Sequence, residues 1–377
     1  MRKTLKEIGG FIPFEQFHNK MLYDGGIKLN CGRNALKFLV RARKIKKILI
    51  PYFLCDSVEK ALIDENVEVL YYHIGWDFKL VLTQTDLNSA QGGTEIEQGK
   101  GTISEGAKRV HQEENRLRET YIYLVNFYGQ ISNSYIREFH VSHPNLIVDN
   151  VQSYFQEPLE GIDTIYSCRK YFGVSDGAIL FSDAKLGENI GTDISYQRMH
   201  YVLGGFERPE SEFFKEYDRK NNDIFEHEPV KKMSSLTENI LHGIDYEFIK
   251  RRRTENFSFL HEALGSKNRL KLTIPDGAFM YPFYTENAEE IRIELFKQHI
   301  YIPQFWEEVL SITKPDDIEY KLTKNILPLP VDQRYDTKTM RILAEKLSAR
   351  TVPVTPIAEK LSARTVPVTP MGFRAKA

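Results

Sequence analysis

The sequence predicts an α/β protein, in which a mainly parallel central sheet flanked by helices is followed by a smaller C-terminal α+β domain. Its 377 residues exceed what one hydrophobic core usually organises. An apolar fraction of 41% and a charged fraction of 27% are typical of a folded globular protein. Between residues 28 and 182, short runs rich in β-branched and aromatic residues alternate with longer amphipathic segments. This alternation is typical of a parallel sheet with helices on both faces.

The strands of the large domain are expected at these short apolar runs. In a parallel sheet, ligands bind beyond the carboxyl ends of the strands, so functional residues are expected there. The predicted strands are Ile45–Pro51, Val67–Ile74, Tyr121–Phe127, Asn145–Asp149, Thr164–Cys168 and Ala178–Ser182.

Residues 86–118 interrupt this pattern. The segment is polar, weakly periodic and poor in β-branched residues, so it offers little apolar surface to bury. We expect a surface insertion within the large domain, which spans residues 1–235. A helix that carries function is the alternative.

A periodic segment from Leu236 to Leu264 is expected to link the two domains. Its apolar residues recur at near-helical spacing, with Arg251, Arg252 and Arg253 on the charged side. We expect these arginines to form a solvated helix face, and the alternative is that one of them binds a substrate carboxylate or phosphate.

The smaller domain, residues 236–350, is expected to contain both strands and helices. The predicted elements are strands near Leu270–Ile274 and Tyr281–Tyr284, a helix over Ala288–Gln298, and a closing helix after Asp336. Residues 343–356 recur almost unchanged as residues 357–370, and two copies are too few for a repeat fold. Residues 351–377 are therefore expected to be a repeated tail without function.

Charge and hydropathy exclude several classes of protein. Lys and Arg number 51 against 52 for Asp and Glu, so no net field favours nucleic acid or an anionic membrane. The apolar runs fall well short of the roughly 20 residues that span a bilayer. Met1–Gly10 lacks the apolar stretch of a secretory signal. Three cysteines without paired metal-ligand spacing, Cys31, Cys55 and Cys168, suit the cytoplasm and predict neither a structural disulfide nor a metal site.

Three loops carry residues that could take part in catalysis or ligand binding. Each of these patterns, taken alone, also has a purely structural explanation. Asn30–Leu36 enters a helix whose first N–H groups face an anion, although a simple turn and cap has the same pattern. Asp149 ends a buried strand, where it would also serve as a helix cap. Lys170 leaves a short strand ahead of two glycines, and a surface lysine beside a turn would look alike.

The combination is more specific than its parts. A pyridoxal enzyme needs a lysine amine for the aldehyde, a carboxylate beside the pyridine nitrogen, and donors around the phosphate. All three occur on successive loops of this sequence. In that role, Asp149 keeps the pyridine nitrogen protonated and Lys170 moves the proton.

These residues resemble the DegT/StrS-type sugar aminotransferases, a group of fold-type I enzymes that depend on pyridoxal 5'-phosphate (PLP). The resemblance covers most of residues 25–345. It rests on five segments in the order typical of that family: Cys31–Leu36, Ile50–Cys55, Val125–Gln130, Val148–Gln152, and Ser167–Lys170 with Asp176–Ala178.

The resemblance implies a PLP-dependent aminotransferase and a role for each matching residue. Residues 1–235 would form the PLP-binding domain, with Lys170 bound to the cofactor and Asp149 beside the pyridine nitrogen. Gln152 would contact the phenolic oxygen. The phosphate would rest on Ser167 and on the backbone of Gly32, Arg33 and Asn34. Lysine rather than histidine at position 170 favours transamination over sugar dehydration.

The family also implies substrates and assembly. Its members typically aminate nucleotide-linked keto-sugars, with glutamate or glutamine as the amino donor, and act as homodimers in polysaccharide biosynthesis. Small-domain segments near Trp306 and Arg334 resemble parts that close over the site, where packing and loop fixation are expected rather than catalysis.

Three positions depart from the family pattern. Cys55 stands where an aromatic ring usually covers the pyridine, and Cys31 stands where a serine hydroxyl is usual. Ser195–Met199 only loosely matches the segment that approaches the phosphate of a second subunit. Two alternatives therefore stay open: another PLP reaction, such as elimination or amino-acid transamination, and a binding protein of the same fold without turnover.

Overall fold

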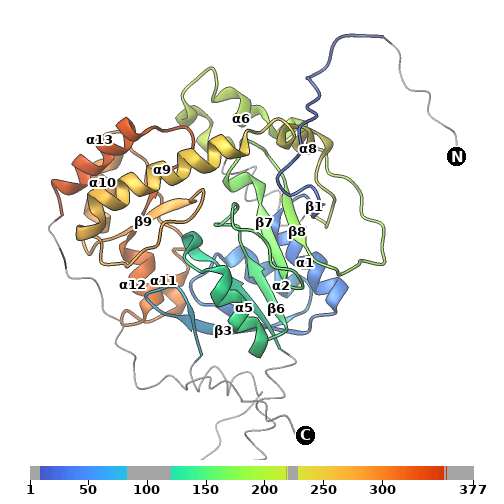
Figure 1. Ribbon diagram of the computed structural model, residues 1–377, viewed down its shortest axis with the longest axis horizontal. Helices are drawn as coiled ribbons and strands as arrows, with labels where there is room; N and C mark the ends of the chain where they lie inside the picture. Colours follow the sequence, from blue (N-terminus) through green and yellow to red (C-terminus); the bar gives the residue numbers. More distant parts are fainter. Residues whose placement is uncertain (1–8, 83–119, 218, 220–227, 352–353, 355–377) are drawn as a thin grey trace, which may run out of the picture.

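The computed structural model describes residues 9–82, 120–217, 219, 228–351 and 354 (Figure 1). Its centre is an eight-stranded sheet in the order β1-β8-β7-β6-β5-β2-β3-β4. The strands are β1 (Ile27–Leu29), β2 (Lys47–Pro51), β3 (Glu68–Ile74), β4 (Leu80–Val81), β5 (Tyr121–Val125), β6 (Leu146–Asp149), β7 (Asp163–Ser167) and β8 (Ala178–Phe181).

The sheet is mainly parallel, which confirms the predicted fold class. β3, β2, β5, β6 and β7 run parallel, whereas β4 and β8 are antiparallel to their neighbours. Helices α1 (Gly32–Arg43) and α2 (Asp56–Asp64) lie behind the sheet in Figure 1, and α5 (Asn133–Ser142) lies in front. The predicted strands of the large domain are all present, with ends within two residues of those expected.

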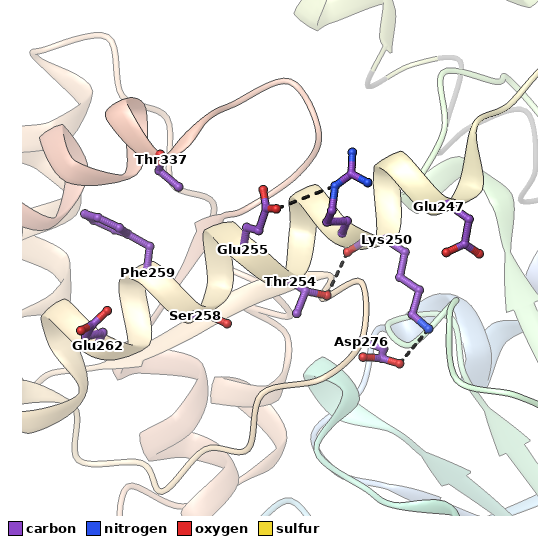
Figure 2. Close-up of a pocket in the computed structure, with 10 residues that line it drawn as sticks. Glu247, Lys250, Thr254, Glu255, Ser258, Phe259, Glu262, Asp276 and Thr337 are labelled. Carbon is purple, nitrogen blue, oxygen red and sulfur yellow. Dashed lines mark hydrogen bonds and ion pairs between the residues drawn. The ribbon is translucent and has the colours of Figure 1, made fainter.

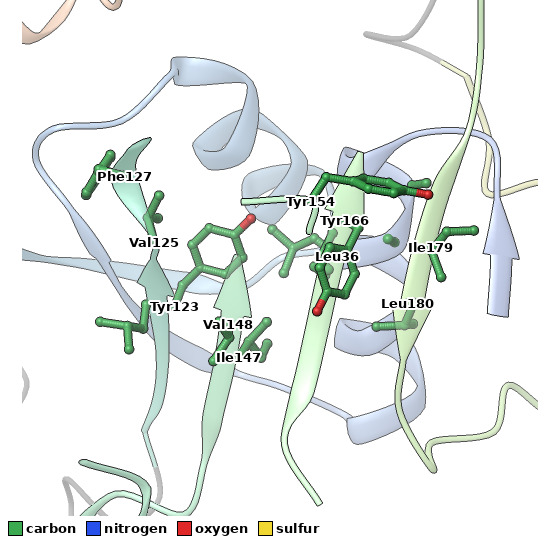
Figure 3. Close-up of a cluster of buried hydrophobic side chains, with 14 of the residues drawn as sticks. Leu36, Tyr123, Val125, Phe127, Ile147, Val148, Tyr154, Tyr166, Ile179 and Leu180 are labelled. Carbon is green, nitrogen blue, oxygen red and sulfur yellow. The ribbon is translucent and has the colours of Figure 1, made fainter. Parts of the chain in front are cut away.

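The central strands are buried along their whole length because helices cover both faces. Every residue of β6 and β7 is buried. Figure 3 shows this part of the core, with Tyr123 of β5 and Val148 of β6 beside Leu36 of α1. The polar residues Asp149 and Ser167 come at the carboxyl ends of β6 and β7, where the sheet meets its loops.

The second part of the structure has its own apolar cluster. It contains a two-stranded antiparallel sheet of β9 (Met280–Tyr284) and β10 (Ile326–Pro330). Its helices include α10 (Ala288–Phe296), α11 (Val309–Ile312), α12 (Ile318–Asn325) and α13 (Thr337–Ser348). Asp336 caps α13 by accepting a hydrogen bond from the Thr339 N–H at 2.9 Å, so the predicted closing helix is confirmed.

The predicted linker is two helices rather than one. α8 (Ser235–Leu241) ends before Gly243, and Asp245 then caps α9 (Tyr246–Leu264) through the Phe248 N–H. α9 joins the two apolar clusters, because Ile249 packs in the first and Phe257 in the second. The boundary at residue 236 stays a prediction.

The strand predicted at Leu270–Ile274 is wrong. Side chains satisfy this segment's backbone instead of a neighbouring strand: Asn268 accepts the Leu270 N–H, and Gln130 accepts the Thr273 N–H at 2.8 Å. β9 pairs with β10, which lies more than forty residues further along the chain. The alternation of apolar residues at Leu270–Ile274 indicated a strand. A strand formed instead at β9, because β10 pairs with it.

Two predictions fall outside the described residues. These are the surface insertion at 86–118 and nearly all of the repeated tail at 351–377. Among the helices that the structure describes, none combines the length and apolarity needed to cross a membrane.

Candidate active site

Lys170 ends η2 (Cys168–Lys170), a single turn that directly follows β7. The chain then returns to the sheet through Gly177, whose N–H donates to the Asn30 carbonyl at 2.6 Å. This hydrogen bond joins the lysine loop to the residues that lead into α1. The carboxyl end of β7 and the amino end of α1 therefore lie together, as the proposed site requires.

Asp149 is buried at the end of β6 and accepts two hydrogen bonds. Its Oδ1 accepts the Val151 N–H at 2.8 Å, and its Oδ2 accepts the Tyr123 hydroxyl at 2.7 Å. Burial raises the pKa of the Asp149 carboxyl, while Lys170 and these two donors oppose the rise. One hydrogen bond to each oxygen leaves acceptor capacity for an N–H of a ligand.

Tyr123 was missed by the sequence reasoning. It lies on β5, two residues before Val125, which pairs with Asp149 in the sheet. Residues in register on parallel strands project to the same face, so Tyr123 and Asp149 share a face. A buried tyrosine in an otherwise apolar central strand was the available signal, because its hydroxyl needs a partner.

The Asp149 carboxylate and Cys55 are near enough to the Lys170 amine to influence its pKa. Its side chain is reached by solvent, but protein atoms crowd the amine, and this partial loss of hydration lowers the pKa of Lys170. Asp149 and Cys55 oppose that shift through their charges, and Arg169 adds to it. The amine also lies 5.6 Å from the centre of the Phe279 ring.

The amino end of α1 begins directly after residues that bond to the lysine loop. Cys31 occupies the cap position without a side-chain cap hydrogen bond, and its carbonyl accepts the Ala35 N–H at 3.0 Å. Burial raises the pKa of the Cys31 thiol, while the Arg169 charge and hydrogen bonds from the Asn34 and Arg33 N–H groups oppose the rise. The Arg169 charge also lowers the pKa of Lys170, and the sequence reasoning did not select this arginine.

The remaining predicted cofactor residues have defined environments. The Asn34 side chain is buried and donates to the Asn30 side chain and to the Glu228 and Pro229 carbonyls, which leaves only its backbone for an anion. Gln152 is buried, and its Oε1 accepts the Tyr128 N–H at 2.9 Å. Ser167 is also buried, at the turn into η2.

Cys55 is at the amino end of α2, and the aromatic residues before it are engaged elsewhere. Tyr52 stacks on Tyr71 at 4.8 Å between ring centres, and Phe53 packs edge-on against Trp306 at 4.6 Å. Both rings are therefore engaged with other aromatic side chains of the protein. The contact with Phe53 shows that Trp306 packs against the core, in line with the packing role expected for it.

Within the described part of the chain, Arg334 forms ion pairs with Asp332 and Glu210, which agrees with a role in fixing loops. Near α2, the Cys55 sulfur and one carboxylate oxygen each from Asp56 and Glu308 lie within 4.8 Å of one another. Glu308 accepts the Asp56 N–H at 2.9 Å, so its carboxylate serves the start of α2.

A pocket lies along the outer side of α9, and Lys170 is not among its lining residues (Figure 2). It has a volume of about 610 Å³, and two of its cations pair with lining carboxylates: Lys250 with Asp276 at 2.8 Å and Arg251 with Glu255 at 3.8 Å. No group in it is poised for chemistry in the way that Lys170 and Asp149 are.

Several solved aminotransferases share this fold. An aminotransferase of the DegT DnrJ EryC1 StrS type from Brucella abortus is 15% identical, with a TM-score of 0.54 and coverage of 87% of each chain. The sugar aminotransferase CalS13 from Micromonospora echinospora is 12% identical, with a TM-score of 0.54 over 86% of this chain and 88% of that one. The chain has the fold of these aminotransferases.

A further structure with this fold comes from Streptococcus pneumoniae and is described as a PLP form. It is 13% identical, with a TM-score of 0.55 over 87% of this chain and 88% of that one. The sequence itself matches no protein-family model and no curated protein. At these identities the likeness establishes the fold, and the chemistry has to be argued from the residues.

Proposed function

We propose that this protein is a PLP-dependent aminotransferase that transfers an amino group from glutamate or glutamine to a nucleotide-linked keto-sugar. One observation carries the proposal: Asp149 and Lys170 lie at the carboxyl ends of the neighbouring strands β6 and β7, and the lysine loop is bonded to the residues that lead into α1. A solved PLP form with the same fold supports the cofactor. Sugar aminotransferases with this fold support the substrate class.

The residues present fit pyridoxal phosphate. Asp149 has acceptor capacity for a pyridine N–H, and a phosphate would lie at the amino end of α1, where the helix dipole and the Arg169 charge favour an anion. Ser167 would add a hydroxyl to the phosphate, and Gln152 would reach the phenolic oxygen. When bound, the cofactor would supply an aldehyde carbon for the lysine and a ring that takes up electrons from the substrate.

Lys170 and Asp149 then have separate tasks. The lowered pKa of Lys170 favours its neutral amine, which accepts a proton at Nζ and returns it. Asp149 keeps a negative charge where the pyridine nitrogen would lie, and the Tyr123 hydroxyl supports that charge. Such a pair serves every reaction that removes a proton next to an amine, so the acceptor has to be identified separately.

The proposal includes assembly and location. Large apolar side chains are exposed around α6 (His200–Gly204) and η4 (Glu210–Phe213): Ile194, Tyr196, Leu203, Phe206, Phe214 and Tyr217. Such a surface supports a homodimer, because monomers seldom leave so many apolar groups in water. The three unpaired cysteines support the cytoplasm. The nucleotide, and a place in polysaccharide biosynthesis, are inferred from the sequence resemblance.

Reductive trapping tests the cofactor and the lysine together. The purified chain is incubated with PLP, reduced with borohydride and mapped by peptide mass spectrometry. We expect one pyridoxyl group, on Lys170, which Lys170→Ala removes and the exposed-site control Lys297→Ala retains. Labelling elsewhere, or none in the wild type, contradicts the proposal.

Product analysis separates the proposed reaction from the alternatives. The chain is supplied with ¹⁵N-labelled glutamate or glutamine and a set of nucleotide keto-sugars. We expect the label in an amino-sugar nucleotide. Label transfer only to 2-oxo acids indicates amino-acid transamination, and release of ammonia indicates elimination. Cofactor binding without turnover of any donor indicates a binding protein.

A further inference from the structure

Arg253 is a buried cation at the junction of the two apolar clusters. It lies on α9 between Ile249, which packs in the first cluster, and Phe257, which packs in the second, and it is 2% exposed. The expectation of a solvated face is therefore wrong for Arg253, although the Arg251 side chain, two residues earlier, is 66% exposed. The helix turns one arginine inward and leaves the other in water.

The contacts of Arg253 are neutral groups. Its Nη1 donates to the Ala278 and Phe279 carbonyls at 3.0 and 3.3 Å, and its Nη2 donates to the Tyr171 carbonyl at 3.3 Å. Its Nε donates to the Gln333 side chain at 2.8 Å. The nearby Asp332 carboxylate is bound to Arg334. Among the residues that the structure describes, Arg253 therefore has no ion-pair partner, and its guanidinium is occupied by these backbone and amide acceptors.

These contacts converge on both neighbours of Lys170. The Tyr171 carbonyl, one residue after the lysine, also accepts the Gln333 Nε2 at 2.8 Å. The Arg253 guanidinium lies 4.5 Å from the centre of the Tyr171 ring. On the other side, Arg253 holds the backbone of Phe279, whose ring lies 5.6 Å from the Lys170 amine. The Arg253 guanidinium thus joins the lysine loop to the segment just before β9.

We propose that Arg253, together with Gln333, is a positioning residue that fixes the Lys170 amine against Asp149. A buried cation is costly to dehydrate, and no carboxylate of the described chain pairs with Arg253, so its hydrogen bonds offset that cost. Those bonds join three segments that are distant in sequence, at Tyr171, at Ala278 and Phe279, and at Gln333. The consequence for catalysis rests on the proposed function, whereas the placement of the amine does not.

The test measures Lys170 without cofactor. In the full-length apo chain, the rate of acetylation by acetic anhydride is followed against pH for each lysine by peptide mass spectrometry. Loosening the loop hydrates the amine and brings it closer to an ordinary lysine, so the midpoint for Lys170 should rise by about half a unit or more in Arg253→Met and Gln333→Ala. Asp149, Cys55 and Arg169 are unchanged in these variants. Arg253→Lys should recover part of the shift.

Matched controls separate positioning from general stability. Arg251→Met removes the exposed arginine of the same helix and should leave the Lys170 midpoint unchanged, and Lys297 should titrate alike in every variant. A Lys170 midpoint equal to wild type in folded Arg253→Met overturns the proposal. If Arg253→Met does not fold, an unchanged midpoint in Gln333→Ala overturns it. Absence of a pyridoxyl group on wild-type Lys170 instead refutes the proposed function.

The rate of the half-reaction provides a second test of the positioning role, and this test rests on the proposed function. The half-reaction with glutamate should slow at least tenfold in Arg253→Met, with a smaller change in the KM for glutamate, because a displaced amine affects proton transfer more than binding. A lower melting temperature with an unchanged rate would show that Arg253 only supports the fold.

Discussion

At the scale of single residues, the hydroxyl of Tyr123 gives Asp149 a charge-supporting partner inside the sheet. Burial and the hydrogen bonds act on this carboxyl in opposite directions, and burial prevails, so its pKa is raised. The Tyr123 hydrogen bond favours the ionised form of Asp149, so losing this donor should raise the pKa of Asp149 further.

Tyr123→Phe should therefore shift activity on the acid side. Without the hydroxyl, the pKa of Asp149 rises further, and the carboxylate is protonated at a higher pH. A hydrogen bond to a charged group is worth about 1.5–3 kcal/mol, so the acid limb of kcat should move up by about one to two pH units. The pH profile is compared with that of Tyr121→Phe, on the same strand without a bond to Asp149. Equal profiles contradict the assigned role.

Arg169 should act on the phosphate rather than on the ring. Its charge reaches both the start of α1 and the Lys170 amine. Arg169→Met should weaken PLP binding about tenfold, which corresponds to one charge-assisted hydrogen bond. Pyridoxal without phosphate is the matched ligand in the same titration, and its affinity should hardly change. A similar loss for both ligands would place Arg169 elsewhere.

At the scale of elements, the lysine loop depends on Gly177. This residue has a φ of +116°, and a Cβ would lie 3.1 Å from Thr237 and 3.2 Å from Cys168. Gly177 also bonds to Asn30, so distortion there would separate the loop from α1.

Gly177→Ala should lower the free energy of unfolding by about 1–3 kcal/mol, from backbone strain together with the close contacts. Gly161→Ala is the control, since Gly161 has a φ of +76° with no atom within 4 Å of an added Cβ. It should lose less, because only the backbone is strained. Urea denaturation measures both, and equal losses would show that the contacts do not matter.

The elements also show how far sequence reasoning extends. Six of the eight strands of the central sheet were predicted because each is a local apolar run, whereas the short β1 and β4 were not predicted. The closing helix was predicted as a helix after Asp336, which caps it. The strand at Leu270–Ile274 failed because strand formation needs a partner, and Gln130 and Asn268 occupy its backbone groups. Lys170 and Asp149 were found because strand ends are visible in the sequence, whereas Tyr123 was missed because its partner lies on another strand.

At the scale of the whole molecule, the apolar surface around α6 and η4 predicts association. Phe206 is 90% exposed and lies among other exposed apolar side chains. Phe206→Glu should shift the chain from dimer toward monomer in sedimentation velocity, because a buried charge at an interface is costly. Ile312→Glu, an exposed apolar residue on α11, is the control and should stay dimeric. A monomeric wild type contradicts this expectation.

The sequence by itself determined the class of the fold, the order of the strands along the chain and the loops that carry Lys170, Asp149 and the start of α1, because all of these follow from local patterns. The tertiary structure alone decided which face of α9 is buried, so that Arg253 bonds to the backbone beside Lys170 instead of lying in water. It also decided that Tyr123 donates to Asp149 and that β10 is the partner of β9. These contacts join residues that are far apart in sequence. The periodicity of apolar residues along the chain does not predict which distant groups will come into contact.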